Sequence, residues 1–474
     1  MPVMLAIPDG ARPGLRFIPP AEKPRLFPVA PLVSWIYTKV LLHIRRIEAH
    51  NIDRLVRLYR QLQDGSIRLI VAFRHPGEED PGLIGRLLCS IVDREARHLG
   101  IPLRTPPRCH FLYGRDVPEW GGKYLEWFLP NTGGISVFPG KYDSQSINTL
   151  RRYMTDKEHP LALAPEGQIT YHAERVAALE PGTAQLAFWC LEDLRKQGRN
   201  EEVMIAPVCT SYHYRDQDWA GLERIVRDME SECGLPLLEG LVLARGGRPA
   251  REPDAASREK LYVRIMRVAR RLVETAEAFY TRFYGARFPA PREEGGTQEL
   301  QERIAGVCDT ALRAAESFFG LAPKGDLVSR VFAVRYSGLA WMFREDIEEL
   351  SRVPPLERAL ADRIAAESWL RLRHMELVDV LEYIRADYLR PDSGIDRFVE
   401  SVLNIRDVIN RLEGGNISGH KNPFKKTARI IVNEPIAVSP HWGAYKANRR
   451  KGVGEVTDEV FRSFCAVAER GNTP

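Results

Sequence analysis

The sequence predicts an α/β fold in which a mostly parallel sheet is flanked by helices. Between residues 40 and 215, short apolar runs alternate with helix-like stretches, which is the pattern of successive βαβ units. After about residue 250 the apolar residues recur at helical spacing, which indicates a bundle of helices. Near the end of the chain, a β-type run at 429–438 precedes a final amphipathic stretch at 456–468.

The first region holds the expected strands, each a short apolar run bounded by polar or turn-forming residues. These strands cover residues 40–47, 67–73, 134–138, 161–164 and 203–208. Helices are expected at 51–62, from Pro81 onward and at 144–154, because Asn51 can cap the first helix and proline suits the first turn of the second. Polar clusters follow the second, third and fourth strands, and sites in open α/β sheets form at such carboxyl ends.

The helical region contains several expected amphipathic helices. They cover residues 261–283, 300–319, 356–388 and 395–412. Arginines between 264 and 271 fall on the polar face of the first helix, which is either solvated or a docking surface for a carrier protein or a membrane. Glycine and proline are dense at 246–253 and 288–296, which indicates linkers or loops.

Composition limits the class of protein. With 474 residues, of which 44% are apolar, the chain can bury the cores of more than one domain. Its 68 Lys and Arg nearly balance its 63 Asp and Glu, and the net charge of +5 is too small to indicate binding to nucleic acid. Between His420 and Lys451, however, stand eight Lys or Arg and one Glu. Such a patch suits an anionic lipid, a phosphate or an acidic carrier protein, or is simply a solvated surface.

The sequence carries no pattern of a metal site, a disulfide framework or a membrane span. Its seven cysteines stand singly, which fits a cytoplasmic protein, and neither a metal nor a cofactor is expected. The first residues lack the basic-then-apolar order of a signal peptide. The most apolar stretch, 29–44, is interrupted by polar residues and is shorter than the ~20 residues of a spanning helix. Trp35 and Tyr37 leave open a shallow contact with a membrane, although an ordinary packed helix is the simpler interpretation.

The first candidate for chemistry follows the strand at 67–73. Four residues separate His75 from Asp80, a spacing at which a turn can fold the carboxylate back onto one imidazole nitrogen. The other nitrogen is then free to take a proton, because imidazole has a pKa of about 6.5 and the carboxylate stabilises the imidazolium. A hydroxyl deprotonated in this way can attack a thioester without a protein nucleophile. By itself such a pair is also expected by chance, since the chain has 11 histidines.

Further blocks follow in order, each at the end of an expected strand. They are GISVFPGK at 134–141, PEG at 165–167 and IAPV at 205–208. With these blocks the chain resembles the glycerolphosphate and lysophosphatidate acyltransferase family. That family carries an H-x4-D block, a block with glycine, an aromatic and a basic residue, a P-E-G block and an apolar block with proline. The resemblance covers 71–208, and the stretches 179–187 and 429–468 also look like parts of such a domain.

The resemblance implies a discontinuous catalytic domain with a large helical insertion before its last strand. Its parts would be an N-terminal arm, the first part of the core, the insertion, and the closing strand and helix, at residues 1–35, 36–215, 216–426 and 427–474. His75 would be the general base and Asp80 its orienting partner. Both assignments come from the positions of these residues in the H-x4-D block.

The resemblance also implies which residues hold the acceptor. Lys141, Glu166 and Gly167 stand at the positions that would do so. Two places depart from the family pattern, since Arg74 stands where asparagine is usual and Gln168-Ile169-Thr170 replaces Thr-Arg-Ser. The second change removes an arginine suited to phosphate. Either Arg74, Lys141 or Arg175 substitutes for it, or the acceptor is not a simple glycerol phosphate.

The leading hypothesis is an O-acyltransferase that moves a fatty acyl group from acyl-CoA or acyl-carrier protein to a hydroxyl of a glycerolipid precursor. Glycerol 3-phosphate and lysophosphatidate are acceptors of this kind, and the protein would work peripherally at the cytoplasmic face of a membrane. One alternative is a lipid- or partner-binding protein that has an acyltransferase-like core without the activity, which the changes at Arg74 and Gln168 favour. The other is a hydrolase, such as a thioesterase, in which water replaces the acceptor.

Overall fold

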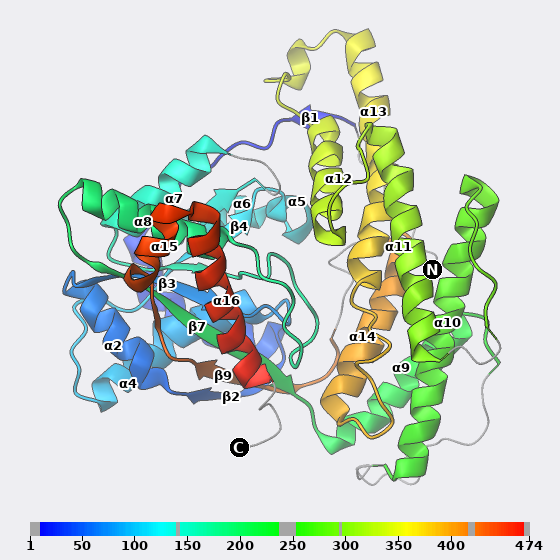
Figure 1. Ribbon diagram of the computed structural model, residues 1–474, viewed down its shortest axis with the longest axis horizontal. Coiled ribbons are helices and arrows are strands. Elements are labelled where there is room, and N and C mark those ends of the chain that lie inside the picture. Colours follow the sequence, from blue (N-terminus) through cyan, green and yellow to red (C-terminus); the bar gives the residue numbers. More distant parts are fainter. Residues whose placement is uncertain (1–9, 139–142, 237–252, 293–295, 416–421, 469–474) are drawn as a thin grey trace. The chain divides into compact units, whose positions relative to one another are not determined.

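The computed structural model describes residues 10–138, 143–236, 253–292, 296–415 and 422–468 of the chain (Figure 1). The chain divides into two compact units. The sheet unit consists of Phe17–Phe138, Tyr142–His213 and Phe424–Pro474, and the helical unit of Met1–Arg16, Pro139–Lys141 and Tyr214–Pro423. Most of the helical unit therefore lies, in the sequence, between two strands of the sheet. The predicted α/β class, with a mostly parallel sheet flanked by helices and a large helical insertion before the last long strand, is confirmed.

The sheet has the strand order β2-β9-β7-β3-β6-β4-β5, and β10 pairs with β7. Its strands are β2 (Ile44–His50), β3 (Ile67–Phe73), β4 (His110–Gly114), β5 (Ile135–Val137), β6 (Leu161–Leu163), β7 (Glu202–His213), β9 (Lys426–Val432) and β10 (Ile436–Ala437). These pairs are parallel, except that β7 runs antiparallel to β9 and β10. All residues of the interior strand β3 are buried, which explains why its sequence is an almost continuous apolar run.

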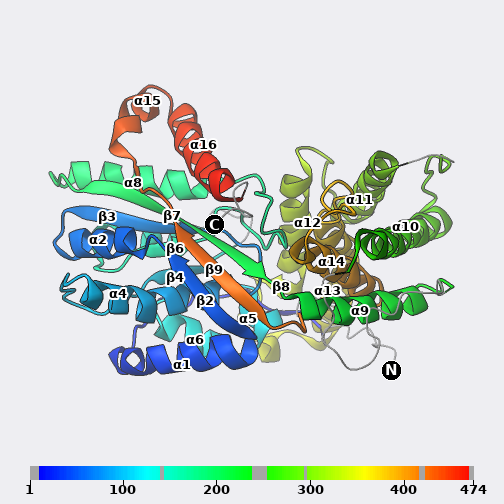
Figure 2. The same ribbon diagram turned by 90° about the horizontal axis from the view of Figure 1, so that it is seen from below.

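Helices cover both faces of this sheet (Figure 2). On one face α7, α8 and α16 pack on the strands through a core that includes Ile70, Phe188, Ile205 and Val456. On the other face α2 packs on β3 and α4. The helical segments of the sheet unit are η1 (Pro24–Val29), α1 (Ala30–Ile36), η2 (Tyr37–Leu41), α2 (Ile52–Gln63), α3 (Asp80–Arg86), η3 (Leu87–Val92), α4 (Asp93–His98), α5 (Val117–Gly121), α6 (Tyr124–Asn131), α7 (Ser144–Asp156), α8 (Gly182–Lys196), η7 (Ser439–His441), α15 (Trp442–Ala447) and α16 (Arg449–Ala468).

The helical unit is a bundle of long helices with a short strand pair. Its elements are β1 (Arg12–Pro13), η4 (Asp216–Asp218), α9 (Trp219–Glu232), α10 (Ala255–Tyr284), α11 (Thr297–Phe319), α12 (Leu327–Met342), β8 (Phe343–Arg344), η5 (Leu350–Arg352), α13 (Pro355–Leu381) and α14 (Ile395–Leu412). The Asp254 side chain caps α10 by accepting a hydrogen bond from the N–H of Ser257 (2.8 Å), and α10 ends at Gly285, whose φ of 65° favours glycine. Arg264, expected on the polar face of this helix, is instead buried in ion pairs with two glutamates of α9.

Several elements differ from the expectation. The run at 40–47, predicted as a strand, begins within the π-helical segment η2, and the chain turns at His43 (φ 54°) before β2 starts. The sequence pattern does not predict β4, α9 or α12. The last helix begins at Arg449 rather than at 456. The units divide the chain at 16/17, 213/214 and 423/424, and the expected boundaries are 35/36, 215/216 and 426/427.

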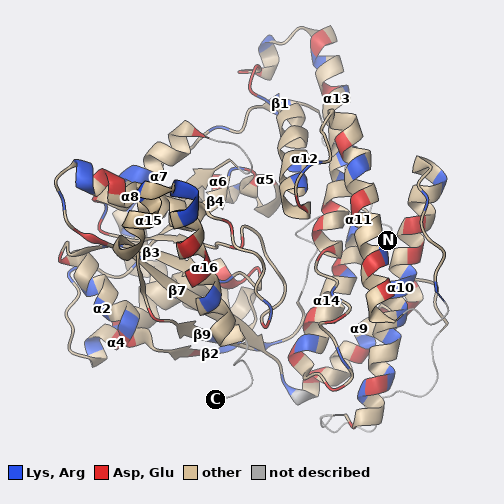
Figure 3. Cartoon of the chain, in the orientation of Figure 1, with Lys and Arg blue, Asp and Glu red and all other residues tan. Residues whose placement is uncertain are grey.

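The basic residues expected to form one patch between 420 and 451 are distributed over different environments. Lys426 is buried in the sheet unit. Figure 3 shows Lys and Arg around the junction of α15 and α16, with acidic residues beside them. There Arg449 pairs with Glu192 at 3.0 Å, so part of the expected positive charge is neutralised. Within the described ranges, no helix has both the length and the apolar character that crossing a membrane requires.

Candidate active site

The candidate site lies in the segment that joins β3 to α3, here called the histidine loop (residues 74–79). β3 ends at Phe73, α3 begins at Asp80 with Pro81 in its first turn, and His75 stands in the loop between them. The loop leaves the carboxyl end of β3, whose neighbours in the sheet are β7 and β6. Carboxyl ends of parallel strands are where open α/β sheets form their sites.

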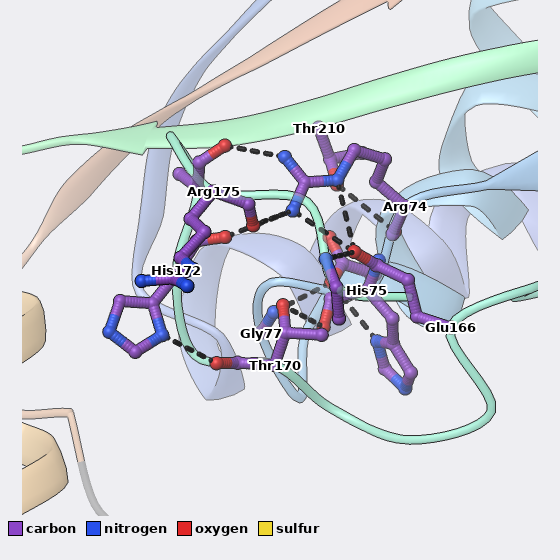
Figure 4. A network of polar contacts seen from close by, with 11 residues as sticks. Arg74, His75, Gly77, Glu166, Thr170, His172, Arg175 and Thr210 are labelled. Carbon is purple, nitrogen blue, oxygen red and sulfur yellow. Dashed lines mark hydrogen bonds and ion pairs between the residues drawn. The ribbon is translucent and has the colours of Figure 1, made fainter. Parts of the chain in front are cut away.

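His75 and Asp80 are in contact. Nδ1 of His75 lies 3.1 Å from Oδ2 of Asp80, whose side chain is fully buried, whereas 16% of the His75 side chain is exposed. Because an ionised carboxylate only accepts hydrogen bonds, Nδ1 carries the proton of the neutral imidazole and Nε2 presents its lone pair. No described residue forms a hydrogen bond with Nε2, and Figure 4 shows the ring at the edge of the polar network. A general base requires an arrangement of this kind, with one ring nitrogen held by a carboxylate and the other available to take a proton.

Two further donors fix the Asp80 carboxylate. The N–H of Gly77 donates to Oδ2 (2.7 Å), which closes the histidine loop on itself. The hydroxyl of Tyr212, near the end of β7, donates to Oδ1 (2.7 Å). Each carboxylate oxygen therefore has a donor besides the imidazole, and the orientation of the carboxylate in turn sets that of the His75 ring.

Lys426, from the last part of the chain, lies next to Tyr212. Nζ of Lys426, the first residue of β9, lies 5.0 Å from the centroid of the Tyr212 ring and forms an ion pair with Glu79 of the histidine loop. The Lys426 side chain is buried, so the ion pair with Glu79 offsets the cost of removing its ammonium group from water. Tyr212 and Lys426 stand on opposite sides of the helical insertion in the sequence, and both support the same loop.

Arg74 and Glu166 form a buried ion pair next to the base. Arg74 is 1% exposed, and its Nη2 lies 3.1 Å from Oε1 of Glu166. The guanidinium also donates to the carbonyl oxygens of His172, Ala173 and Arg175 (Figure 4). Arg74 was expected to contact an acceptor, but in this structure its donors are directed to protein groups away from solvent. The side chain therefore ties the histidine loop to the segment that follows the P-E-G block.

The Glu166 carboxylate holds the backbone of the base. The N–H of His75 donates to Oε2 (2.7 Å), and the N–H of Ala177 donates to Oε1 (3.3 Å). On its other side, the His75 carbonyl oxygen accepts a hydrogen bond from the N–H of Thr170 (2.9 Å). The geometry thus gives Glu166, expected to hold the acceptor, the role of positioning His75.

Gly167 makes the turn that carries Glu166. Its φ of 72° lies in the left-handed region, and a Cβ at this position would come within 2.5 Å of Oε1 of Glu180. Burial raises the pKa of the Glu180 carboxyl. The left-handed backbone therefore favours glycine here, and a Cβ would also displace the end of the Glu180 side chain. Lys141, the remaining residue expected to hold the acceptor, lies outside the described residues.

A cysteine nucleophile does not fit the surroundings of the base. Cys209 of β7 is buried beside the Arg74–Glu166 pair, and burial raises the pKa of its thiol to about 12 although Arg74 acts in the opposite direction. Such a thiol is not a thiolate at neutral pH. In the part of the chain that the structure describes, no group of three or more His, Cys, Asp or Glu side chains is placed to hold a metal ion.

The structure joins four of the six expected site residues, Arg74, His75, Asp80 and Glu166, in one network, and Gly167 forms the turn next to Glu166. It also adds supports that sequence reasoning missed. One pattern in the sequence places Tyr212 near the histidine loop. Side chains alternate along a strand, so Tyr212 lies on the same side of β7 as Thr210. The Thr210 hydroxyl donates to the carbonyl oxygen of Arg74 (3.3 Å). No local pattern points to Lys426, which reaches the site only through the pairing of β9 with β7.

Comparison with known proteins assigns no family. The chain matches no protein-family model, and no curated protein matches it. The geometry of the histidine loop is therefore the basis on which a function can be proposed.

Proposed function

We propose that this protein is an O-acyltransferase that moves a fatty acyl group from acyl-CoA or acyl-carrier protein to a hydroxyl of a glycerolipid precursor. The observation that carries the proposal is the 3.1 Å contact of His75 Nδ1 with a buried Asp80, which leaves Nε2 as an accessible base. The resemblance of the blocks at 71–208 to the acyltransferase pattern supports the choice of this reaction among those that a His–Asp pair can assist.

The reaction proceeds by direct transfer. Nε2 of His75 takes the proton of the acceptor hydroxyl while its oxygen forms a bond to the thioester carbonyl carbon. The C–S bond of the resulting tetrahedral intermediate then breaks, and the imidazolium returns the proton to the departing thiolate. Asp80 stabilises the imidazolium between these two steps and keeps Nδ1 as the protonated nitrogen. The products are an ester and a free thiol, and no acyl-enzyme forms.

The surroundings of the base favour direct transfer over a covalent route. Cys209, the thiol beside the Arg74–Glu166 pair, is held in its protonated form by burial. The ion pair itself holds the His75 backbone rather than the substrate. The protein thus supplies a positioned proton acceptor, and the acceptor hydroxyl serves as the nucleophile.

An acyl-transfer assay with the purified full-length chain tests the proposal. Radiolabelled acyl-CoA or acyl-carrier protein is supplied with glycerol 3-phosphate, lysophosphatidate or a lipid extract, and the labelled products are identified by mass spectrometry. We expect an ester product, and we expect His75→Ala to lower turnover by roughly 10²- to 10⁴-fold. His98→Ala, at an exposed histidine of α4, is the matched control.

The outcomes separate the proposal from its alternatives. Turnover retained in His75→Ala, with an unchanged circular dichroism spectrum, would refute the role of His75. Free fatty acid as the sole product would identify a hydrolase. Binding of the acyl thioester without turnover with any acceptor would identify a binding protein, a candidate favoured by the burial of Arg74, the side chain expected to replace the missing acceptor contact.

A further inference from the structure

Helix α1 and segment η2 expose an apolar surface on the sheet unit. Leu32, Trp35, Val40 and Leu41 are exposed, the last to 65%. A surface helix usually buries its apolar side and exposes its polar side. Here the polar atoms are turned inward, since the Thr38 side chain is buried and its hydroxyl donates to the helix backbone. The apolar side chains of α1 and η2 are therefore not explained by packing within the sheet unit.

Aromatic side chains of α6 extend this surface. Tyr124 is 68% exposed and Trp127 is 54% exposed. Figure 2 shows α6 next to α1, and Nζ of Lys23, just before η1, lies 5.3 Å from the Trp127 ring centroid. Burial raises the pKa of the Tyr37 hydroxyl, and the nearby Tyr124 adds to that rise. We call the exposed apolar side chains of α1, η2 and α6 the apolar surface.

The apolar surface is fixed to the helix that begins at the candidate site. The Arg86 side chain donates to the carbonyl oxygen of Pro31 (2.7 Å), and the Ser34 hydroxyl lies 3.3 Å from the Cys89 sulfur. The Tyr37 ring fills the space beside Gly82, where a Cβ would come within 2.6 Å of Cε1. Gly82 belongs to α3, two residues after Asp80. One layer of side chains thus separates the apolar surface from the helix that carries Asp80.

The charge around the apolar surface suits an anionic lipid bilayer. From Lys23 to Arg46 the chain has five Lys or Arg and no Asp or Glu. Lys23, Arg25, Lys39, Arg45 and Arg46 are all exposed. Basic residues near a membrane surface are attracted to anionic lipid, while Trp and Tyr prefer the headgroup level. Acidic residues are also present, since Arg46 lies 3.6 Å from Glu48 and Glu126 of α6 is exposed between Tyr124 and Trp127. The five Lys and Arg outnumber these two glutamates, so the surroundings of the apolar surface keep an excess of positive charge.

We propose that the apolar surface of α1, η2 and α6 docks the protein on the surface of a bilayer that contains anionic lipid. The side chains enter the interface to the depth of the headgroups, and the flanking Lys and Arg contact the lipid phosphates. This inference rests on the proposed function, because it identifies the lipid bilayer as the source of the acceptor. Tyr37 of η2 lies beside Gly82 of α3, two residues after Asp80, so docking through α1 and η2 places the start of α3 near the interface.

Co-sedimentation of the full-length chain with vesicles tests the proposal. Vesicles of phosphatidylcholine with phosphatidylglycerol are compared with vesicles of phosphatidylcholine alone. We expect binding to the anionic vesicles, and we expect the triple variant Leu32→Ser, Leu41→Ser, Trp127→Gln to weaken it by roughly 10²-fold or more. The matched control is Phe283→Ser, at a residue of α10 that is 63% exposed, and it should bind as the wild type does.

Three results would overturn the proposal. They are equal binding to both kinds of vesicle, binding retained by the triple variant, and a loss of binding in Phe283→Ser as large as in the triple variant. A dimer that dissociates in the triple variant, seen by analytical ultracentrifugation without vesicles, would show that a second copy covers the surface instead. Thermal unfolding of each variant verifies its folding. Because vesicle binding needs no turnover, His75→Ala should bind normally, and failure of the acyl-transfer assay leaves this test intact.

Discussion

The Tyr212 hydroxyl donates a 2.7 Å hydrogen bond to the Asp80 oxygen that His75 does not contact. Tyr212→Phe removes this bond and no substrate contact, so we expect kcat of acyl transfer to fall about 10- to 100-fold with KM little changed, since a hydrogen bond to a charged group is worth about 1.5–3 kcal/mol. Steady-state kinetics measure both. Tyr445→Phe is the control, because that buried hydroxyl bonds to Gln185 instead. A change confined to KM would contradict the positioning role.

The Arg74–Glu166 pair should contribute strongly to stability. Arg74→Met leaves a buried carboxylate without its cation, and we expect a loss of about 3–5 kcal/mol in the free energy of unfolding, measured by urea denaturation. Arg363→Met, which breaks an exposed pair with Glu367, should cost less than about 1 kcal/mol. Similar losses in the two variants would show that burial of the pair does not matter.

Gly167→Ala should be more harmful than the same change at an open position. Gly198 has a similar φ, 69° against 72°, but nothing lies within 4 Å of a Cβ placed there. Gly198→Ala therefore measures the cost of the left-handed backbone alone, about 1–2 kcal/mol. Gly167→Ala adds the clash with Glu180, so its stability loss should be larger and its kcat lower. Denaturation and kinetics of both variants check this, and equal losses would argue against the clash.

His159 should make the fold less stable in acid. Burial lowers its pKa from 6.5 to about 3, and Arg108 and other cations act in the same direction. The unfolded chain therefore binds a proton at His159 near pH 6.5, whereas the folded chain binds it only near pH 3. The contribution of the neutral His159 to the free energy of unfolding is therefore complete above pH 6.5, and it falls by up to about 1.4 kcal/mol per pH unit between pH 6.5 and about pH 3. His159→Leu should flatten the decline of unfolding free energy between these pH values, measured with urea. His98→Leu, at an exposed histidine, should not.

Much of the sheet unit could be predicted because its signals are local. The strand expected at 67–73 coincides with β3, since a strand buried on both faces reads as one apolar run bounded by turns. The pattern at 40–47 predicts a strand throughout, but β2 starts only at Ile44, because short apolar runs fit a helix as well as a strand. His43, between η2 and β2, has a left-handed backbone (φ 54°). A turn of this kind is usually marked in a sequence by glycine, which is absent here. β4 was missed because His110–Gly114 has no β-branched residue and follows a stretch rich in proline.

The candidate site was predictable only to the extent that its parts lie close in the sequence. The His75–Asp80 contact follows from spacing and a turn, and the structure has it. The roles of Arg74 and Glu166 depend on burial, which a sequence does not show for a charged residue, and the structure pairs them with each other. Tyr212 and Lys426 come to the site through strand pairing over long sequence separations, so no local pattern predicts that Tyr212 contacts Asp80 or that Lys426 contacts Glu79.

The pairing of β7 with β9 has a consequence for the insertion between them. Tyr212 is two residues before Tyr214, where the chain enters the helical unit, and Lys426 is two residues after Phe424, where the chain returns to the sheet unit. Both supports of the histidine loop therefore lie close to the ends of the insertion, Tyr212 through Asp80 and Lys426 through Glu79. An excision of the insertion that did not preserve the register of β7 against β9 would remove both supports at once.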